Sequence, residues 1–144
     1  NLEDLTRQLL DVEDEIVIIG TSLGGYYAYQ LLNKNANIIG CILFNPCFDV
    51  SHLKQFIGTH KNYCTGVEYE FTSECFESYK NIEISTMVPT KVFLANNDRV
   101  INNIESAKFW RDKASVRWFN GEHRISNFDD FAEDILSIGN YFVI

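Results

Sequence analysis

Ser22, Asp98 and His123 are three residues of this chain whose types could carry out nucleophilic chemistry together. A serine hydroxyl is a weak nucleophile until an imidazole accepts its proton and later returns that proton to the leaving group. A carboxylate holds the imidazole in the required tautomer and stabilises the imidazolium that forms. These residue types predict acyl transfer, with Ser22 as nucleophile, His123 as base and Asp98 as acid.

The serine lies at the centre of Gly-Thr-Ser-Leu-Gly, residues 20–24, directly after the apolar run 16–19. A strand, G-x-S-x-G and a helix together form a sharp turn that lifts the serine hydroxyl clear of a sheet. We expect a Cβ at Gly20 or Gly24 to collide where strand and helix cross, and the Leu23 N–H to face a developing oxyanion. The pattern also fits a serine that only caps the helix.

The elements that must position these residues form an α/β pattern, because apolar runs alternate with helical segments. The predicted strands are residues 16–19, 38–44, 89–95 and 115–119. The predicted helices lie near residues 2–10, 23–31, 104–110 and 129–138. Continuous apolar strands that flank a helix predict a mostly parallel sheet of about four strands flanked by helices, with the more amphipathic last strand at an edge.

The carboxyl ends of parallel strands meet along one edge of a sheet. Ser22, Asp98 and His123 each follow a predicted strand, so we expect them to converge there, in the chain order serine, acid, histidine. Each also has an ordinary interpretation, as a turn residue or a solvated loop side chain. The competing acids and bases are Asp49, Glu122, His52 and His60.

Residues 47–87 lack a sustained period and contain short helical pieces at about 51–57 and 72–79. An irregular insertion after a strand is a place where α/β enzymes carry ligand-covering loops, although an ordinary surface excursion is equally compatible. Among the aromatic residues near the strand ends, Tyr26, Phe44 and Phe48 are candidates for an apolar substrate-binding pocket, and core packing would explain them equally well.

Composition narrows the partners. The chain has 144 residues, which suits one domain, and its formal net charge of −8 disfavours nucleic acid and anionic membranes as partners. No apolar run is long enough to span a bilayer. The four cysteines form no C-x-x-C pair and lie at irregular spacing from the histidines, so we expect reduced thiols, a cytoplasmic setting, no metal and no cofactor.

Several segments together resemble the YqiA/YcfP-like esterase family of the α/β-hydrolase superfamily. They are GTSLGGYYA, FNP, the stretch containing FIGTHKNYCTGVEYEF, and the GEH turn followed by FDDF. The resemblance implies a small-molecule acyl ester or thioester as substrate, with Ser22, Asp98 and His123 in the roles given above. It also implies that the insertion at residues 47–87 covers the substrate.

The chain departs from that family at its start. Family members begin with a strand and a His-Gly-Phe-like turn that supplies a second oxyanion donor, and neither precedes residue 16 here. We therefore expect a partial α/β-hydrolase fold that lacks its N-terminal part, or a homo-oligomer in which the strand at 16–19 pairs with another chain. The alternative function is a non-catalytic hydrolase-fold binding or assembly module.

Overall fold

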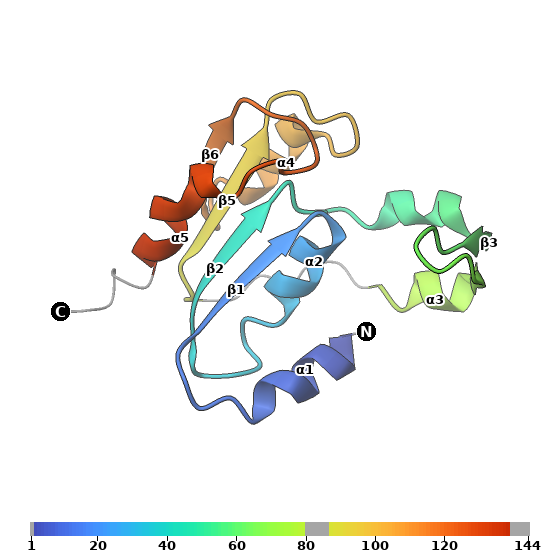
Figure 1. Ribbon diagram of the computed structural model, residues 1–144, viewed down its shortest axis with the longest axis horizontal. Coiled ribbons are helices and arrows are strands. Elements are labelled where there is room, and N and C mark those ends of the chain that lie inside the picture. The colour runs from blue at the N-terminus through green and yellow to red at the C-terminus, as the bar shows by residue number, and fades with distance from the viewer. Residues whose placement is uncertain (1, 80–86, 139–144) are drawn as a thin grey trace. The chain divides into compact units, whose positions relative to one another are not determined.

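The computed structural model describes residues 2–79 and 87–138 (Figure 1). The chain divides into two compact units, one made of residues 1–47 and 82–144 and the other of residues 48–81. The second unit lies within the stretch whose periodicity is irregular in the sequence. The first unit carries the predicted sheet.

The sheet of the first unit has four parallel strands in the order β1-β2-β5-β6. Its strands are β1 (Ile16–Thr21), β2 (Ile38–Phe44), β5 (Thr90–Ala95) and β6 (Ser115–Phe119). All four end on the same side of the sheet, as the arrowheads in Figure 1 show. The expected α/β fold with a parallel sheet flanked by helices is therefore confirmed.

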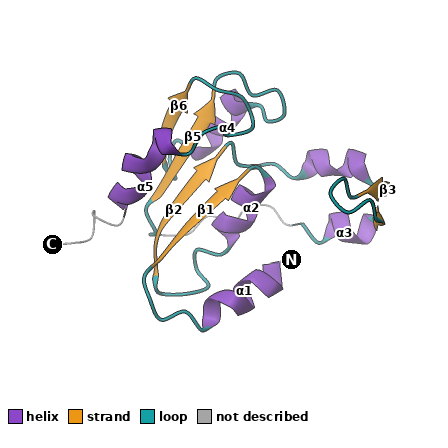
Figure 2. Ribbon diagram, in the orientation of Figure 1, coloured by secondary structure: helices purple, strands orange, loops and turns teal. Residues whose placement is uncertain are grey.

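Helices cover both faces of this sheet (Figure 2). They are α2 (Leu23–Gln30), α4 (Asn103–Trp110), the short 3-10 turn η2 (Asp129–Phe131) and α5 (Ala132–Ile138), whereas α1 (Leu2–Leu10) precedes β1 and buries none of its residues. A ring contact of 4.8 Å between Tyr29 of α2 and Trp110 of α4 shows that these two helices share one face. Among the described helices, none is both long and apolar enough to cross a membrane.

The two central strands, β2 and β5, bury side chains on both faces, which explains their continuous apolar sequences. On one face, Ile42 and Phe44 pack with Phe93, Phe131 and Ile138, the last from α5. On the α2 side, burial raises the pKa of the Cys41 thiol to about 12. Burial, together with the nearby Cys41, also raises the pKa of Tyr29 to about 12.

The two outer strands differ from the central pair. Within the described ranges β1 pairs only with β2, and Ile19 of β1 is 46% exposed. In β6, Val116 and Phe119 are half-buried and the other three residues are exposed, in keeping with its amphipathic sequence. The described part of the sheet therefore has one apolar edge and one mixed edge.

The second unit contains a hairpin that the sequence pattern did not predict. Its elements are the 3-10 helix η1 (Ser51–Phe56), β3 (Gly58–Lys61), β4 (Glu68–Phe71) and α3 (Ser73–Glu77). The antiparallel pair β3–β4 is closed by a turn in which the Asn62 side chain accepts hydrogen bonds from the N–H groups of Cys64 and Thr65. The two helical pieces expected from the sequence correspond to η1 and α3.

Candidate active site

Ser22 lies between the end of β1 and the start of α2, in a backbone conformation that non-glycine residues rarely adopt, with φ 52° and ψ −123°. Three backbone hydrogen bonds hold it there. Its N–H donates to the Phe44 carbonyl, and its own carbonyl accepts from Gly25 and Cys47, each at 2.9 Å. Bonds to the end of β2 and beyond it therefore stabilise the strained turn.

The three glycines near Ser22 differ in whether a side chain would fit at their positions. A Cβ on Gly20 would lie 2.5 Å from the Gly24 carbonyl oxygen, and one on Gly25 would lie 2.7 Å from the Pro46 Cβ. A Cβ on Gly24 would meet nothing within 4 Å. The prediction of a collision is confirmed at Gly20. It is wrong at Gly24, because the helix turns its second residue away from the strand. The other crowded position is Gly25.

The first residue of α2 is Leu23, whose backbone N–H belongs to the helical turn that has no intrahelical acceptors. The helix dipole adds positive potential at this end. Ser22 itself makes no side-chain capping hydrogen bond to the helix. The interpretation of Ser22 as a mere helix cap is therefore wrong, and its hydroxyl is available for another partner.

Asp98 follows β5 by three residues, and its carboxylate is held by the loop that carries it. Oδ1 accepts hydrogen bonds from the N–H groups of Val100 at 2.7 Å and Ile101 at 2.9 Å. The side chain is 0% exposed, and Oδ2 faces Nδ1 of His123 at 2.8 Å. One oxygen is thus anchored by the backbone while the other faces the imidazole.

His123 lies in the loop after β6 and joins the other two residues. Its Nδ1 is 2.8 Å from Asp98 Oδ2, and its Nε2 is 2.9 Å from Ser22 Oγ. Because an ionised carboxylate can only accept, we assign the proton to Nδ1, which leaves Nε2 to accept from the serine hydroxyl. The ring is 19% exposed, so it is shielded yet reachable from solvent.

The competing acids and bases are accounted for by local contacts. Asp49 accepts from the Ser51 N–H at 2.8 Å, and hydrogen bonds from Ser51 lower the pKa of its carboxyl. His52 and His60 bond to backbone carbonyls within their own unit. Glu122 is exposed beside His123. In residues 2–79 and 87–138, no cluster of three or more histidine, cysteine or acidic side chains could hold a metal ion.

Two of the three aromatic residues predicted to bind substrate are buried in the core. Phe44 is 0% exposed and stacks on Phe93 at 5.0 Å in the core, so its predicted contact with substrate is wrong. Tyr26 is 4% exposed on the buried side of α2, and the same correction applies. Both residues occupy positions where the sheet and its helices pack together. Phe48 belongs to the second unit, and its role stays a prediction.

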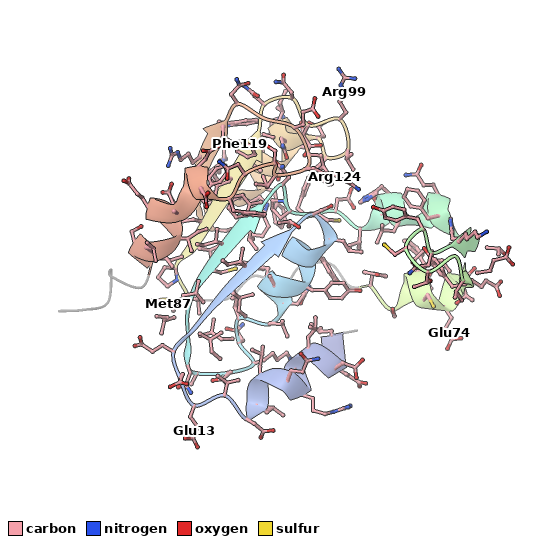
Figure 3. All side chains as sticks on the ribbon, in the orientation of Figure 1. Glu13, Glu74, Met87, Arg99, Phe119 and Arg124 are labelled. Atoms are coloured by element: carbon pink, nitrogen blue, oxygen red, sulfur yellow. The ribbon has the colours of Figure 1, made fainter. Side chains whose placement is uncertain are left out.

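A cavity of about 310 Å³ lies beside His123, and sequence reasoning did not find it. It is lined by Asn97, Arg99, Val100, Glu122, His123 and Arg124. Figure 3 shows Arg99 and Arg124 at the end of the sheet where the strands terminate, with Arg99 directed outward. Each arginine directly follows a member of the serine–histidine–aspartate cluster, which was the available sequence signal.

Within residues 2–79 and 87–138, these two arginines are distinguished by having no carboxylate in ion-pair contact. The other three arginines each lie within 4 Å of an aspartate: Arg7 of Asp4, Arg111 of Asp112 and Arg117 of Asp134. Neither cavity arginine has such an ion pair with any described residue. The cavity therefore presents two available cations in a chain whose net charge is −8.

Solved structures with a similar fold are hydrolases. A provisionally assigned hydrolase from Agrobacterium vitis S4 has a TM-score of 0.63 and 17% identity, covering 96% of this chain and 63% of its own. The esterase domain of a Rhodothermus marinus protein has a TM-score of 0.63 and 18% identity, covering 98% and 68%. The thioesterase domain of the curacin biosynthetic pathway has a TM-score of 0.63 and 15% identity, covering 94% and 71%.

At these identities the likeness establishes the α/β-hydrolase fold, and the chain spans less than two thirds of the length of the Agrobacterium protein. The family model described as "Uncharacterised protein family (UPF0227)" matches residues 1–140, which confirms the resemblance to YqiA/YcfP-like esterases. The chain therefore belongs to the UPF0227 family and has the fold of the α/β hydrolases.

Proposed function

We propose that this chain is a serine-dependent hydrolase that cleaves carboxylic esters or acyl thioesters through an acyl-enzyme on Ser22. The observation that carries the proposal is the position of the His123 ring, 2.9 Å from the Ser22 hydroxyl and 2.8 Å from the Asp98 carboxylate. The three side chains come from three separate loops, so local sequence alone does not bring them together. Their distances suit proton transfer between an alcohol, an imidazole and an acid.

The reaction would proceed in two displacements. Ser22 Oγ attacks the substrate carbonyl as His123 Nε2 takes its proton, and the Leu23 N–H stabilises the negative oxygen that develops. Asp98 stabilises the imidazolium, which then protonates the departing alcohol or thiol. Water, deprotonated by the same histidine, attacks the acyl-enzyme and releases the acid together with free Ser22.

The substrate class is supported by the names of two proteins with similar folds. One is an esterase domain and the other a thioesterase domain. Both reactions share the acyl-enzyme and differ only in whether oxygen or sulfur leaves. The chemistry at Ser22 accommodates either, because His123 can protonate an alkoxide or a thiolate.

We also propose that the outer edge of β1 pairs with a further strand, either from an N-terminal segment or from a second copy of the chain. This edge carries Ile19, which is 46% exposed, and an unpaired apolar edge favours strand addition. Light scattering across a range of concentrations checks the second copy. A monomer at every concentration would contradict that arrangement.

Hydrolysis of p-nitrophenyl acetate by the wild-type chain and by Ser22→Ala tests the proposed activity. We expect the variant to lose at least about 1,000-fold in kcat, because alanine has no hydroxyl to attack the substrate. Ser126→Ala is the matched control, since it removes an exposed hydroxyl three residues beyond His123. Turnover retained in Ser22→Ala would refute the nucleophile. A wild-type chain that reacts with a fluorophosphonate but turns over no ester would support the binding-module alternative.

A further inference from the structure

Asn45 is a fully buried polar residue at the carboxyl-terminal edge of the sheet. It follows β2 directly, is 0% exposed and has a φ of 43°. Asparagine tolerates this left-handed conformation better than most side chains. Its backbone N–H donates to the Phe93 carbonyl of β5 at 2.9 Å, so the residue sits between the ends of the two central strands.

The side-chain amide of Asn45 is satisfied at every position. Nδ2 donates to the carbonyls of His123 at 3.0 Å and Glu122 at 3.3 Å. Oδ1 accepts from the Ala95 N–H at 2.7 Å and from Nδ2 of Asn103 at 3.0 Å. The reverse orientation would set Oδ1 against two carbonyls, so the surroundings fix the amide as described.

Asn103, the first residue of α4, extends these contacts to the acid. It is 6% exposed, and its Nδ2 also faces the Ala95 carbonyl at 2.9 Å and Asp98 Oδ2 at 3.4 Å. Its Oδ1 is buried without a partner among the described residues. Turning the amide around would place that oxygen against three others, which explains why the unpaired orientation persists.

These contacts form a closed circuit. It runs from the His123 ring to Asp98, through Asn103 to Asn45, and back to the His123 backbone carbonyl. We propose that Asn45 is a positioning residue of the active site, which fixes the loop that carries His123 relative to the strand ends that carry Asp98 and Ser22. The inference rests on the proposed function. Asn45 is fully buried and its described polar partners are protein groups, so it acts through His123 rather than on substrate.

The physical reason lies in how the imidazole is placed. The ring bridges two partners at 2.8 and 2.9 Å, so a shift of its backbone by 1 Å breaks at least one bond. Asn45 donates hydrogen bonds to the backbone carbonyl of His123 and to that of the residue before it. These bonds restrain the backbone from which the ring projects. Misplacement of about 1 Å by a change outside the reacting groups can cost about 100-fold in rate.

The variant that tests this role is Asn45→Asp. Aspartate has the same shape, tolerates the same backbone conformation and keeps the oxygen that faces Ala95, but as a carboxylate it cannot donate to the two carbonyls. The other end of the same strand offers a matched control. Asn37 directly precedes β2, and its Nδ2 donates to the carbonyls of Val12 at 3.1 Å and Glu13 at 3.0 Å. Asn37→Asp thus removes the same pair of donors far from the site.

Three measurements on the folded variants separate positioning from general support. Each rate is measured at the pH at which that variant is fastest. A shift of the pH profile by the new charge near His123 therefore does not contribute to the difference in rate. We expect Asn45→Asp to lower kcat and the rate of Ser22 fluorophosphonate labelling by about 100-fold, with KM nearly unchanged. The ¹⁵N signals of the His123 ring should show loss of the single Nδ1–H tautomer. Asn37→Asp should match the wild type in all three.

The outcomes distinguish this inference from the proposed function. If the wild type neither labels nor hydrolyses, the proposed function fails, and the ring spectrum still decides the positioning role. The inference is overturned if the folded Asn45→Asp variant gives the same ring signals as the wild type. It is also overturned if the wild type is labelled and the variant is labelled equally fast, or if Asn37→Asp loses as much as Asn45→Asp. If Asn45→Asp does not fold, Asn103→Ala is judged by the same criteria. This variant removes the hydrogen bonds that link Asn45 to Asp98, and alanine is a good helix former at the start of α4.

Discussion

Replacing Gly20 with alanine tests the strand–helix crossing on which the position of Ser22 depends. The added Cβ would lie 2.5 Å from the Gly24 carbonyl oxygen and 2.7 Å from the Ala28 Cβ. Ordinary contacts of this kind begin near 3.4 Å, so β1 and α2 would have to separate by several tenths of an ångström or more. Because the obstacle is backbone rather than a flexible side chain, we expect a destabilisation of about 2 kcal/mol.

For a chain of this size the loss corresponds to a fall in Tm of about 6 °C, measured by circular dichroism. Ester hydrolysis below the unfolding transition should fall as well, because Ser22 moves with the start of α2. Gly24→Ala is the matched control, since its Cβ meets nothing within 4 Å. It should leave hydrolysis unchanged and stabilise the chain by about 0.5 kcal/mol, as alanine does in helices. Equal Tm values for the two variants would refute this account of the crossing.

Three further predictions concern other parts of the chain. Tyr29 and Cys41 have raised pKa values in the folded chain, so above pH 9 unfolding releases their protons. Their contribution to the free energy of unfolding should be fully present below pH 9 and should be lost as the pH rises toward about 12, which is measured as Tm against pH. Replacing both Arg99 and Arg124 with glutamine should raise KM about tenfold for an ester bearing a carboxylate but not for a neutral ester. Thr72→Ala removes the side-chain acceptor for the Cys75 N–H at the start of α3 and should cost about 1 kcal/mol in urea unfolding of the second unit.

The sheet and the cluster of Ser22, Asp98 and His123 could be predicted from sequence because both depend on simple patterns. Strands buried on both faces must be apolar throughout, and parallel strands bring the residues that follow them to one edge. The hairpin β3–β4 could not be predicted in this way. Its strands, GTHK and EYEF, have only four residues each and are largely exposed; EYEF alternates acidic and aromatic residues, but GTHK carries no apolar side chain, so nothing in the sequence marks the partner strand.

The errors within the site have a common cause, which is that contacts between distant segments leave no local pattern. Phe44 ends the same apolar run whether its ring faces a pocket or the core, and only the packing of Phe93 and Phe131 against it shows which of the two holds. Gly25 is needed because Pro46, 21 positions away, lies against it. Asn45 bonds to residues 50, 58 and 78 positions later in the chain, and nothing near it in the sequence signals those partners.

Peptide-resolved mass spectrometry after reaction with a fluorophosphonate tests most directly whether Ser22 is the activated nucleophile. The geometry predicts one adduct, on the Ser22 hydroxyl, and strong loss of that adduct in His123→Asn, because the hydroxyl then lacks its base. An adduct on a different residue of the wild-type chain, or undiminished labelling of Ser22 in His123→Asn, would contradict the account.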